Sequence, residues 1–155
     1  MRHRRRPRRH ERLRREAQTG FRGKIVHETK IRVRYAEIDA QGHVNNATYL
    51  SYFEVGRVEW LRATGHSYRE MERQGRGLVV VKALLHYRRP AFFDDELALI
   101  TNLAELGKVS LLFDYKVLRD AEVLVTGHTR HACIDLATGK PIRMPEELLE
   151  LGKGS

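Results

Sequence analysis

The segment RYAEIDAQGHVNNATYLSYFEVGR, residues 34–57, joins a polar stretch to a run rich in aromatic residues. Asp39, His43 and two consecutive asparagines crowd into the positions just before the aromatic residues begin. Polar residues in front of a helix usually cap it, because the first backbone N–H groups of a helix have no partners within it. This segment holds more polar residues than a cap requires, so it is the first candidate for a functional loop.

The chain around this loop predicts one strand, one long helix and four further strands. Residues 30–37 alternate Ile31, Val33 and Tyr35 with arginines, which is the period of a half-buried strand. Residues 46–65 have helical spacing and predict a helix of roughly four turns that ends at a glycine. A short helix over 67–74 and strands over 77–90, 95–106, 108–119 and 122–136 follow. Strands joined by short turns pair antiparallel, so the predicted fold class is α+β, with one helix on a five-stranded sheet.

Length and composition limit the kind of protein. At 155 residues the chain fits one domain with a core and is short for two. The single cysteine, Cys133, excludes an internal disulfide and a paired-cysteine zinc site, and we expect it to be a small core residue. No apolar run reaches the roughly 18 residues of a membrane span. We therefore expect a cytoplasmic protein that does not associate with a membrane.

The positive charge is concentrated at the N-terminus. Residues 1–24 hold 11 of the 29 Lys and Arg residues and 2 of the 20 Asp and Glu residues, so the net charge of +9 lies in this segment. It has few apolar residues to bury and is predicted to be a disordered basic arm. Such an arm can neutralise phosphates, but a solvated tail or a start codon assigned too far upstream is the favoured interpretation, and a nucleic-acid partner is not expected. An organelle-targeting peptide is the remaining alternative.

Several common catalytic motifs are absent. The chain has no G-x-S-x-G nucleophile elbow, no phosphate-binding loop and no dinucleotide fingerprint, which argues against serine hydrolases and nucleotide-hydrolysing enzymes. His128 and His131 are three residues apart in a predicted strand, so they are expected to point to opposite faces. No metal site is predicted.

A carboxylate beside a helix N-terminus suits acyl transfer. Free N–H groups and the helix dipole, about half a positive charge, together form an oxyanion site. If a carbonyl binds the amides near Asn45 and Asn46, Asp39 lies a few residues upstream and can act on the carbonyl carbon or on a water beside it. The alternative is structural, with Asp39 in an Asx-turn and one asparagine as the helix cap. Spacing alone favours the structural alternative.

The Asp-x-x-Gly-His-Val-Asn-Asn core, followed by HYRRPAFFDDEL and a strand-rich remainder ending DLATGKPIRMP, resembles the hot-dog-fold acyl-CoA thioesterases of the 4-hydroxybenzoyl-CoA type. The resemblance spans about residues 25–145. It implies that residues 25–155 form a hot-dog thioesterase domain, in which an antiparallel five-stranded sheet wraps around one long helix. It also implies hydrolysis of an acyl-CoA to a free carboxylic acid and coenzyme A, without a cofactor, because coenzyme A is part of the substrate.

The resemblance assigns residues to this reaction. Asp39 becomes the catalytic carboxylate, either as general base or as nucleophile, and the helix N-terminus becomes the oxyanion site. Lys108, in the turn between the third and fourth strands, is expected to bind the phosphates of coenzyme A, and Arg88 and Arg89, near the end of the second strand, can reach the same groove. The alternative is that all three side chains are only solvated. On the helix, Glu54 is expected to pair with Arg57. The full set of expected substrate-binding residues is His43, Val44, Asn45, Asn46, Tyr49, Arg88 and Lys108.

Other interpretations stay open. The motif also resembles plant acyl-carrier-protein thioesterases, although Gln41 replaces an asparagine of their motif and no second hot-dog repeat is present. The spacing typical of (R)-specific enoyl-CoA hydratases is absent, and a non-catalytic acyl-CoA or nucleic-acid binding protein is the remaining alternative. Because a small sheet with one helix leaves an edge uncovered, we expect a homodimer or homotetramer. In the resembled family the acyl groove lies between two subunits.

Overall fold

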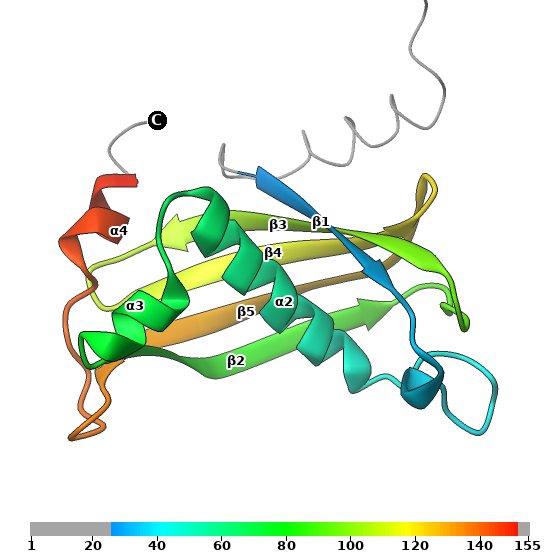
Figure 1. Cartoon of the computed structure of the whole chain (residues 1–155), viewed down its shortest axis with the longest axis horizontal. Coiled ribbons are helices and arrows are strands. Elements are labelled where there is room, and N and C mark those ends of the chain that lie inside the picture. Colours follow the sequence, from blue (N-terminus) through cyan, green and yellow to red (C-terminus); the bar gives the residue numbers. More distant parts are fainter. Residues whose placement is uncertain (1–25, 152–155) are drawn as a thin grey trace, which may run out of the picture.

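A computed structural model describes residues 26–151, which form one curved antiparallel sheet with a long helix lying across it (Figure 1). The predicted basic arm, residues 1–24, lies outside the described residues, and its disorder stays a prediction. Within residues 26–151 no helix is long and apolar enough to cross a membrane.

The strands and helices follow one another as the sequence predicts. In chain order they are β1 Val26–Arg32, the 3-10 turn η1 Tyr35–Glu37, α2 Thr48–Ala63, α3 Tyr68–Arg73, β2 Arg76–Tyr87, β3 Glu96–Leu106, β4 Ser110–Arg119, β5 Glu122–Asp135 and α4 Glu146–Leu151. The strand order in the sheet is β1-β3-β4-β5-β2, and all neighbours are antiparallel. The five-stranded hot-dog arrangement is confirmed, and it leaves β1 and β2 as the two edge strands.

Two local predictions are wrong. The first strand covers Val26–Arg32 rather than residues 30–37, and Tyr35 is 79% exposed instead of facing the core. The chain leaves the strand because the backbone N–H of Arg34 donates to the Glu37 carboxylate at 2.7 Å, which closes the turn η1. The short helix α4 was not predicted, since its six residues carry too little periodicity to be recognised.

The helix α2 packs on the sheet through aromatic rings. Phe53 stacks on Tyr115 of β4 with ring centroids 4.1 Å apart and planes 4° from parallel. Trp60 meets Phe113 edge to face at 5.2 Å. These rings are fully buried, and their large apolar area makes the contact between helix and sheet the main stabilising interface of the fold. The helix ends as predicted, at Gly65 with a φ of +87°.

Gly56 sets how closely α2 approaches the sheet. A methyl group at this position would lie 2.4 Å from Thr101 Oγ1 and 2.6 Å from Leu99 Cδ2. Both β3 side chains are fully buried, so neither has room to withdraw. The glycine therefore lets the helix lie in direct contact with β3.

Replacing Gly56 tests this close contact. Gly56→Ala should lower the free energy of unfolding by about 1–3 kcal/mol, because the overpacking outweighs the higher helix propensity of alanine. Urea unfolding would measure the change, with Ser51→Ala at an exposed position of the same helix as the control. An alanine variant as stable as the wild type would show that the sheet yields at this point.

Candidate active site

The loop between η1 and α2 is held by the Asp39 carboxylate. Asp39 Oδ1 accepts hydrogen bonds from the backbone N–H of Gln41 at 2.9 Å and of His43 at 3.4 Å. Gly42 allows the turn with a φ of +86°. The predicted Asx-turn is therefore present. It uses one carboxylate oxygen, while Oδ2 lies 3.4 Å from His43 Nδ1.

The same loop is tied to segments distant in sequence. The Val44 N–H donates to the Ala91 carbonyl at 2.9 Å, and the Asn45 N–H donates to the Glu37 carbonyl at 2.9 Å. His43 forms an isolated β-bridge with Phe92. These bonds fix the loop against the segment that follows β2, so the start of α2 and the end of β2 form one rigid corner.

The start of α2 leaves the backbone amide of Asn46 without an acceptor among residues 26–151. Asn45 caps the turn, because its Oδ1 accepts from the Ala47 N–H at 3.0 Å and its carbonyl accepts from the Thr48 N–H at 2.9 Å. From Gly42 to Thr48, the N–H of Asn46 alone has no hydrogen-bond acceptor among residues 26–151. At a helix N-terminus such a group attracts a negatively charged oxygen.

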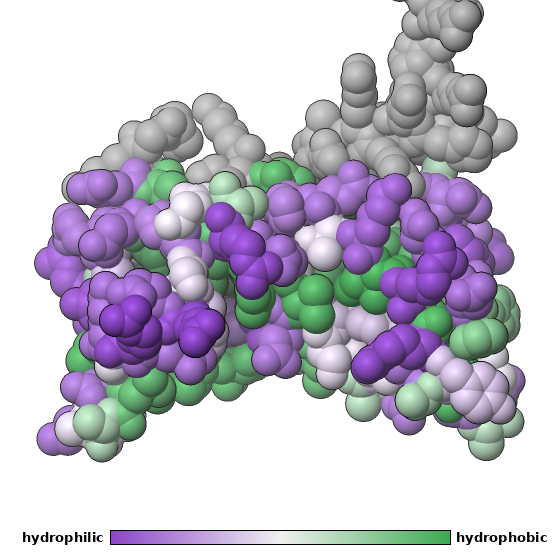
Figure 2. Space-filling view, in the orientation of Figure 1, coloured by the Kyte–Doolittle hydropathy of each residue, from purple (hydrophilic) through white to green (hydrophobic). Residues whose placement is uncertain are grey.

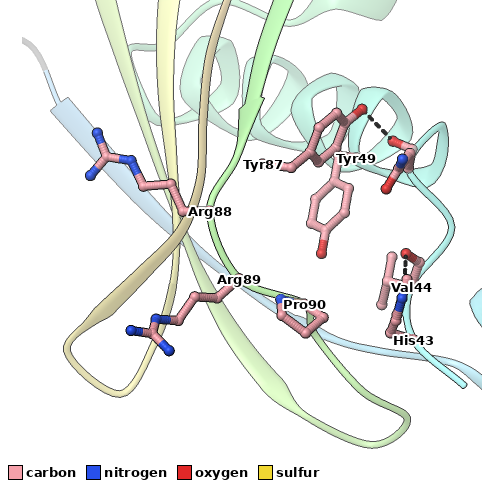
Figure 3. Close-up of a pocket in the computed structure, with 8 residues that line it drawn as sticks. His43, Val44, Tyr49, Tyr87, Arg88, Arg89 and Pro90 are labelled. Atoms are coloured by element: carbon pink, nitrogen blue, oxygen red, sulfur yellow. Dashed lines mark hydrogen bonds between the residues drawn. The ribbon is translucent and has the colours of Figure 1, made fainter.

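A cavity of about 230 Å³ opens at this corner. It is lined by His43, Val44, Asn46, Tyr49, Tyr87, Arg88, Arg89 and Pro90. The Tyr87 hydroxyl donates to the Asn46 carbonyl at 2.9 Å and so connects β2 with the loop. Figure 3 shows Tyr49 between Tyr87 and the pair His43 and Val44, with its ring directed into the cavity.

Two tyrosines near the loop are held in their neutral form. Burial raises the pKa of Tyr49. Burial, followed by the hydrogen bond to Glu37 at 3.0 Å, raises the pKa of Tyr52. Both hydroxyls are therefore protonated at neutral pH, and neither is suited to act as a base there. Asp39 and His43 are the remaining acid-base groups of the loop.

The structure brings most of the predicted residues together. His43, Val44, Asn46, Tyr49 and Arg88 line the same cavity. Asp39 does not line it directly but reaches it through its contact with His43. Asn45 is used in the turn, and its side chain is not part of the cavity wall.

Lys108 does not line this cavity, and within one chain it does not lie beside Arg88. Lys108 lies in the turn between β3 and β4, where its carbonyl accepts from the Met144 N–H at 2.7 Å. This turn is at the end of the sheet where β2 begins. Arg88 follows the opposite end of β2. Figure 3 shows its guanidinium directed away from His43. The pKa of Lys116 is lowered first by the burial of Lys116 itself and then by the charge of Arg88. Lys116 lies on the sheet face away from α2.

Sequence reasoning missed Tyr87 and Pro90. Both stand in the quoted HYRRP run, but a strand pattern does not tell which end of a strand meets a distant loop. The contact depends on the bonds that hold Val44 to Ala91, and these join residues far apart in sequence.

A second set of polar residues lies inside the core, under the middle of α2. Arg57 Nη1 donates to the Tyr115 hydroxyl at 3.2 Å, Tyr115 contacts Thr129 Oγ1 at 2.6 Å, and Thr129 contacts His131 Nε2 at 2.7 Å. Burial, aided by the charge of Arg57, lowers the pKa of His131 to about 4. The predicted ion pair between Glu54 and Arg57 is not formed: among residues 26–151, Arg57 has no ion pair.

Two further groups have structural rather than catalytic surroundings. Cys133 is fully buried, and burial raises the pKa of its thiol, so it is the core residue predicted. His128 and His131 lie on opposite faces of β5, as expected, because His131 contacts Phe113 under the helix. Residues 26–151 contain no cluster of three or more His, Cys, Asp or Glu side chains arranged for a metal ion.

Comparison with known proteins identifies the family. A sequence profile described as the Thioesterase-like superfamily matches residues 33–151. The chain belongs to the Thioesterase-like superfamily. It is 34% identical over 125 residues to the long-chain acyl-CoA thioesterase FadM of Escherichia coli, covering 79% of this chain and 94% of FadM. It is 33% identical over 119 residues to the acyl-CoA thioesterase YbgC of Haemophilus influenzae, covering 76% and 88%.

Comparison with solved structures supports the same family. The DHNA-CoA thioesterase of Staphylococcus aureus matches with a TM-score of 0.78 and 28% identity over 83% of this chain and 87% of that enzyme. The resemblance seen in the sequence is therefore confirmed, and the chain is a thioesterase with the hot-dog fold.

The buried imidazole gives this thioesterase a pH-dependent stability. His131 has a pKa near 4 in the fold, below its ordinary value of 6.5, so the unfolded chain takes up the proton first as the pH falls. The stability contributed by the neutral ring is complete above pH 6.5 and is lost between about pH 6.5 and pH 4, by on the order of 3 kcal/mol.

Urea unfolding at pH 7 and pH 4.5 would measure this loss. The free energy of unfolding should fall less between pH 7 and pH 4.5 in His131→Gln than in the wild type, because the variant lacks the buried imidazole. His128→Gln, on the other face of β5, should show the same fall as the wild type. Equal pH dependence in the wild type and His131→Gln would show that other groups cause the acid sensitivity.

Proposed function

We propose that this thioesterase hydrolyses an acyl-CoA to a carboxylic acid and coenzyme A, with Asp39 as general base. The names of FadM and YbgC support acyl-CoA as the substrate class. The observation that carries the proposal is the free N–H of Asn46 in the wall of a cavity next to the Asp39 and His43 pair. The site thus combines a hydrogen-bond donor for an oxyanion with a carboxylate that can accept a proton.

The position of the carboxylate favours a base over a nucleophile. Asp39 Oδ1 is occupied by two backbone N–H groups, and Asp39 lies behind His43 instead of in the cavity wall. A water placed between the carboxylate and the thioester can lose its proton to Oδ2 while its oxygen attacks the carbonyl carbon.

The remaining steps follow from the same groups. The negative charge that develops on the carbonyl oxygen binds the Asn46 N–H at the N-terminus of α2. Collapse of the tetrahedral intermediate breaks the carbon–sulfur bond, and the leaving thiolate takes the proton held by Asp39. The proposed reaction needs no cofactor, because water and the two protein groups supply every atom and proton transferred.

A second copy of the chain on the β2 edge would complete the substrate groove. The exposed β2 side chains Val79, Val80 and Val81 form an apolar strip, and a β-bulge follows Val80. Figure 2 shows hydrophobic surface along the edge of the molecule where β2 lies. An open, apolar strand edge readily pairs with another strand. We therefore propose a homodimer formed by antiparallel pairing of two β2 strands, and a homotetramer built from it is compatible with this edge.

This pairing explains the separation of the two cations. Lys108 lies at the end of the sheet where β2 begins, and Arg88 lies where β2 ends. Antiparallel pairing places the start of one β2 beside the end of the other, so Lys108 of one protomer and Arg88 of its partner come to the same end of the joined sheet. There the two cations can bind the phosphates of one coenzyme A.

Asp39→Asn tests the catalytic assignment. The amide can still accept the Gln41 N–H bond and keep the loop folded, but it cannot take a proton from water. We expect kcat to fall at least about 100-fold with KM little changed, measured by thiol release from a panel of acyl-CoA substrates.

Asp94→Asn is the matched control. It makes the same chemical change in an exposed turn outside the site, and asparagine tolerates its positive φ of 66°. An Asp39→Asn enzyme with near wild-type kcat would reduce Asp39 to the turn-forming role.

Val80→Lys tests the proposed dimer. A lysine in each of the two paired edge strands would bring like charges into an apolar interface, so the variant should be monomeric and should lose most of its thioesterase activity. Light scattering after size-exclusion chromatography measures the mass. Val109→Lys, at another exposed valine in the turn between β3 and β4, should leave the dimer intact. A monomeric wild-type protein with full activity would contradict the shared groove.

A further inference from the structure

The carboxylate of Glu37 is largely buried close to the candidate active site, but the proposed reaction does not use it. Its side chain is 12% exposed, and Glu37 does not line the cavity beside Asp39 and His43. A carboxylate with so little contact to water has to be satisfied by hydrogen-bond donors of the protein. The donors around Glu37 therefore indicate what this side chain does.

The Glu37 side chain joins the start of the loop to the helix α2. Its Oε1 accepts from the backbone N–H of Arg34 at 2.7 Å and from the Tyr52 hydroxyl at 3.0 Å. Its Oε2 lies 3.3 Å from Arg34 Nη2. Tyr52 is 3% exposed, and burial followed by the hydrogen bond to Glu37 raises the pKa of its hydroxyl. This hydroxyl is therefore protonated at neutral pH and donates to the carboxylate.

The backbone of Glu37 closes the base of the same loop. Its carbonyl accepts from the Asn45 N–H at 2.9 Å. Inside this closure, the Asp39 N–H donates to the His43 carbonyl at 2.9 Å. Residues 38–44 thus form a short loop whose two ends meet at Glu37 and Asn45.

Both groups proposed for catalysis lie one or two residues from this base. Asp39 is the second residue after Glu37. Asn46, whose N–H is the proposed oxyanion donor, directly follows Asn45. A displacement of Glu37 therefore moves the carboxylate that activates water relative to the amide that binds the oxyanion. A misplacement of about 1 Å at a reacting centre can lower the rate roughly a hundredfold.

We infer that Glu37 is a positioning residue, which ties the base of the loop to Tyr52 of α2 and so aligns the Asn46 N–H with the attacking water. The inference rests on the proposed function, in which this N–H binds the oxyanion. The bond from the Val44 N–H to the Ala91 carbonyl does not involve Glu37. Loss of the Glu37 carboxylate should therefore displace the Asn46 amide without unfolding the loop.

Glu37→Leu tests the positioning role. The variant removes both acceptor oxygens of the side chain, so the base of the loop loses its bond to α2. We expect kcat to fall roughly tenfold to a hundredfold with KM little changed, because an oxyanion donor acts on the transition state more than on the bound substrate. Thiol release from the panel of acyl-CoA substrates measures both constants.

Two milder variants separate position from charge. Glu37→Gln keeps an oxygen that can accept from Tyr52 and Arg34, so its kcat should stay near the wild-type value. Tyr52→Phe removes one hydrogen bond and should lower kcat by less than Glu37→Leu does. The double variant Glu37→Leu with Tyr52→Phe should be no slower than Glu37→Leu alone, because both changes break the same contact.

Amide hydrogen exchange reports on the loop in the absence of substrate. The Asn45 N–H should exchange faster in Glu37→Leu than in the wild type, because its bond to the Glu37 carbonyl opens more often. In Glu37→Gln the same N–H should stay protected.

Glu70→Leu and Tyr35→Phe are the matched controls. Like Glu37, Glu70 pairs with an arginine three residues away, Arg73 at 3.2 Å, but it lies on α3 and does not line the cavity. Tyr35 is exposed in the same turn η1 as Glu37. Both control variants should keep the wild-type kcat and the protection of the Asn45 N–H.

The outcomes separate this inference from the proposed function. A wild-type kcat in Glu37→Leu would overturn the positioning role, and so would a Glu37→Gln enzyme as slow as the leucine variant, since the charge would then matter more than the position. Tyr52→Phe with full kcat and a protected Asn45 N–H would overturn it even if Glu37→Leu fails to fold. If no acyl-CoA is hydrolysed, the proposed function fails, and exchange of the Asn45 N–H alone decides whether Glu37 holds the loop.

Discussion

The close contact between α2 and the sheet is the constraint on which the structure depends. It requires two glycines: Gly56 on the helix faces Leu99 and Thr101, and a methyl group on Gly127 of β5 would lie 2.8 Å from the Phe53 ring. The helix can therefore lie directly on the strands, with Phe53 covering Gly127. Because the stacked rings fix both the height and the direction of the helix, they also fix where its N-terminus lies.

The geometry of the loop at the candidate active site follows from this contact. The helix N-terminus is brought to the end of β2, where Tyr87 donates to Asn46 and Ala91 accepts from Val44. Asn45 accepts from the N–H groups of Ala47 and Thr48, while the N–H of Asn46 stays free in the wall of the cavity. The structural and the functional interpretations of the polar loop are thus compatible, since the Asx-turn of Asp39 is what presents its second carboxylate oxygen to His43.

The sequence predicts those secondary-structure elements that are set by residues close together in the chain. The long helix, its end at Gly65 and the run of four strands follow from periodicity and turn residues. The exposed Tyr35 was assigned to the core because an alternating pattern does not reveal a hydrogen bond that bends the chain. Lys108 was placed near Arg88 because sequence order does not tell which end of an antiparallel sheet a turn occupies. The fold was thus more predictable than the site, whose walls join distant segments.

The predicted Glu54–Arg57 pair is not formed because Arg57 bonds to the core instead. A helix pair three residues apart contributes a few tenths of a kcal/mol at an exposed site, whereas a hydrogen bond to a buried hydroxyl contributes more. Arg57 accordingly turns inward to Tyr115. Burial among apolar side chains and the charge of Arg57 keep His131 neutral, with its Nε2 within hydrogen-bond distance of Thr129 Oγ1 at 2.7 Å. The core thus positions a cation at the cavity between α2, α3 and β2, whose wall also includes Glu54.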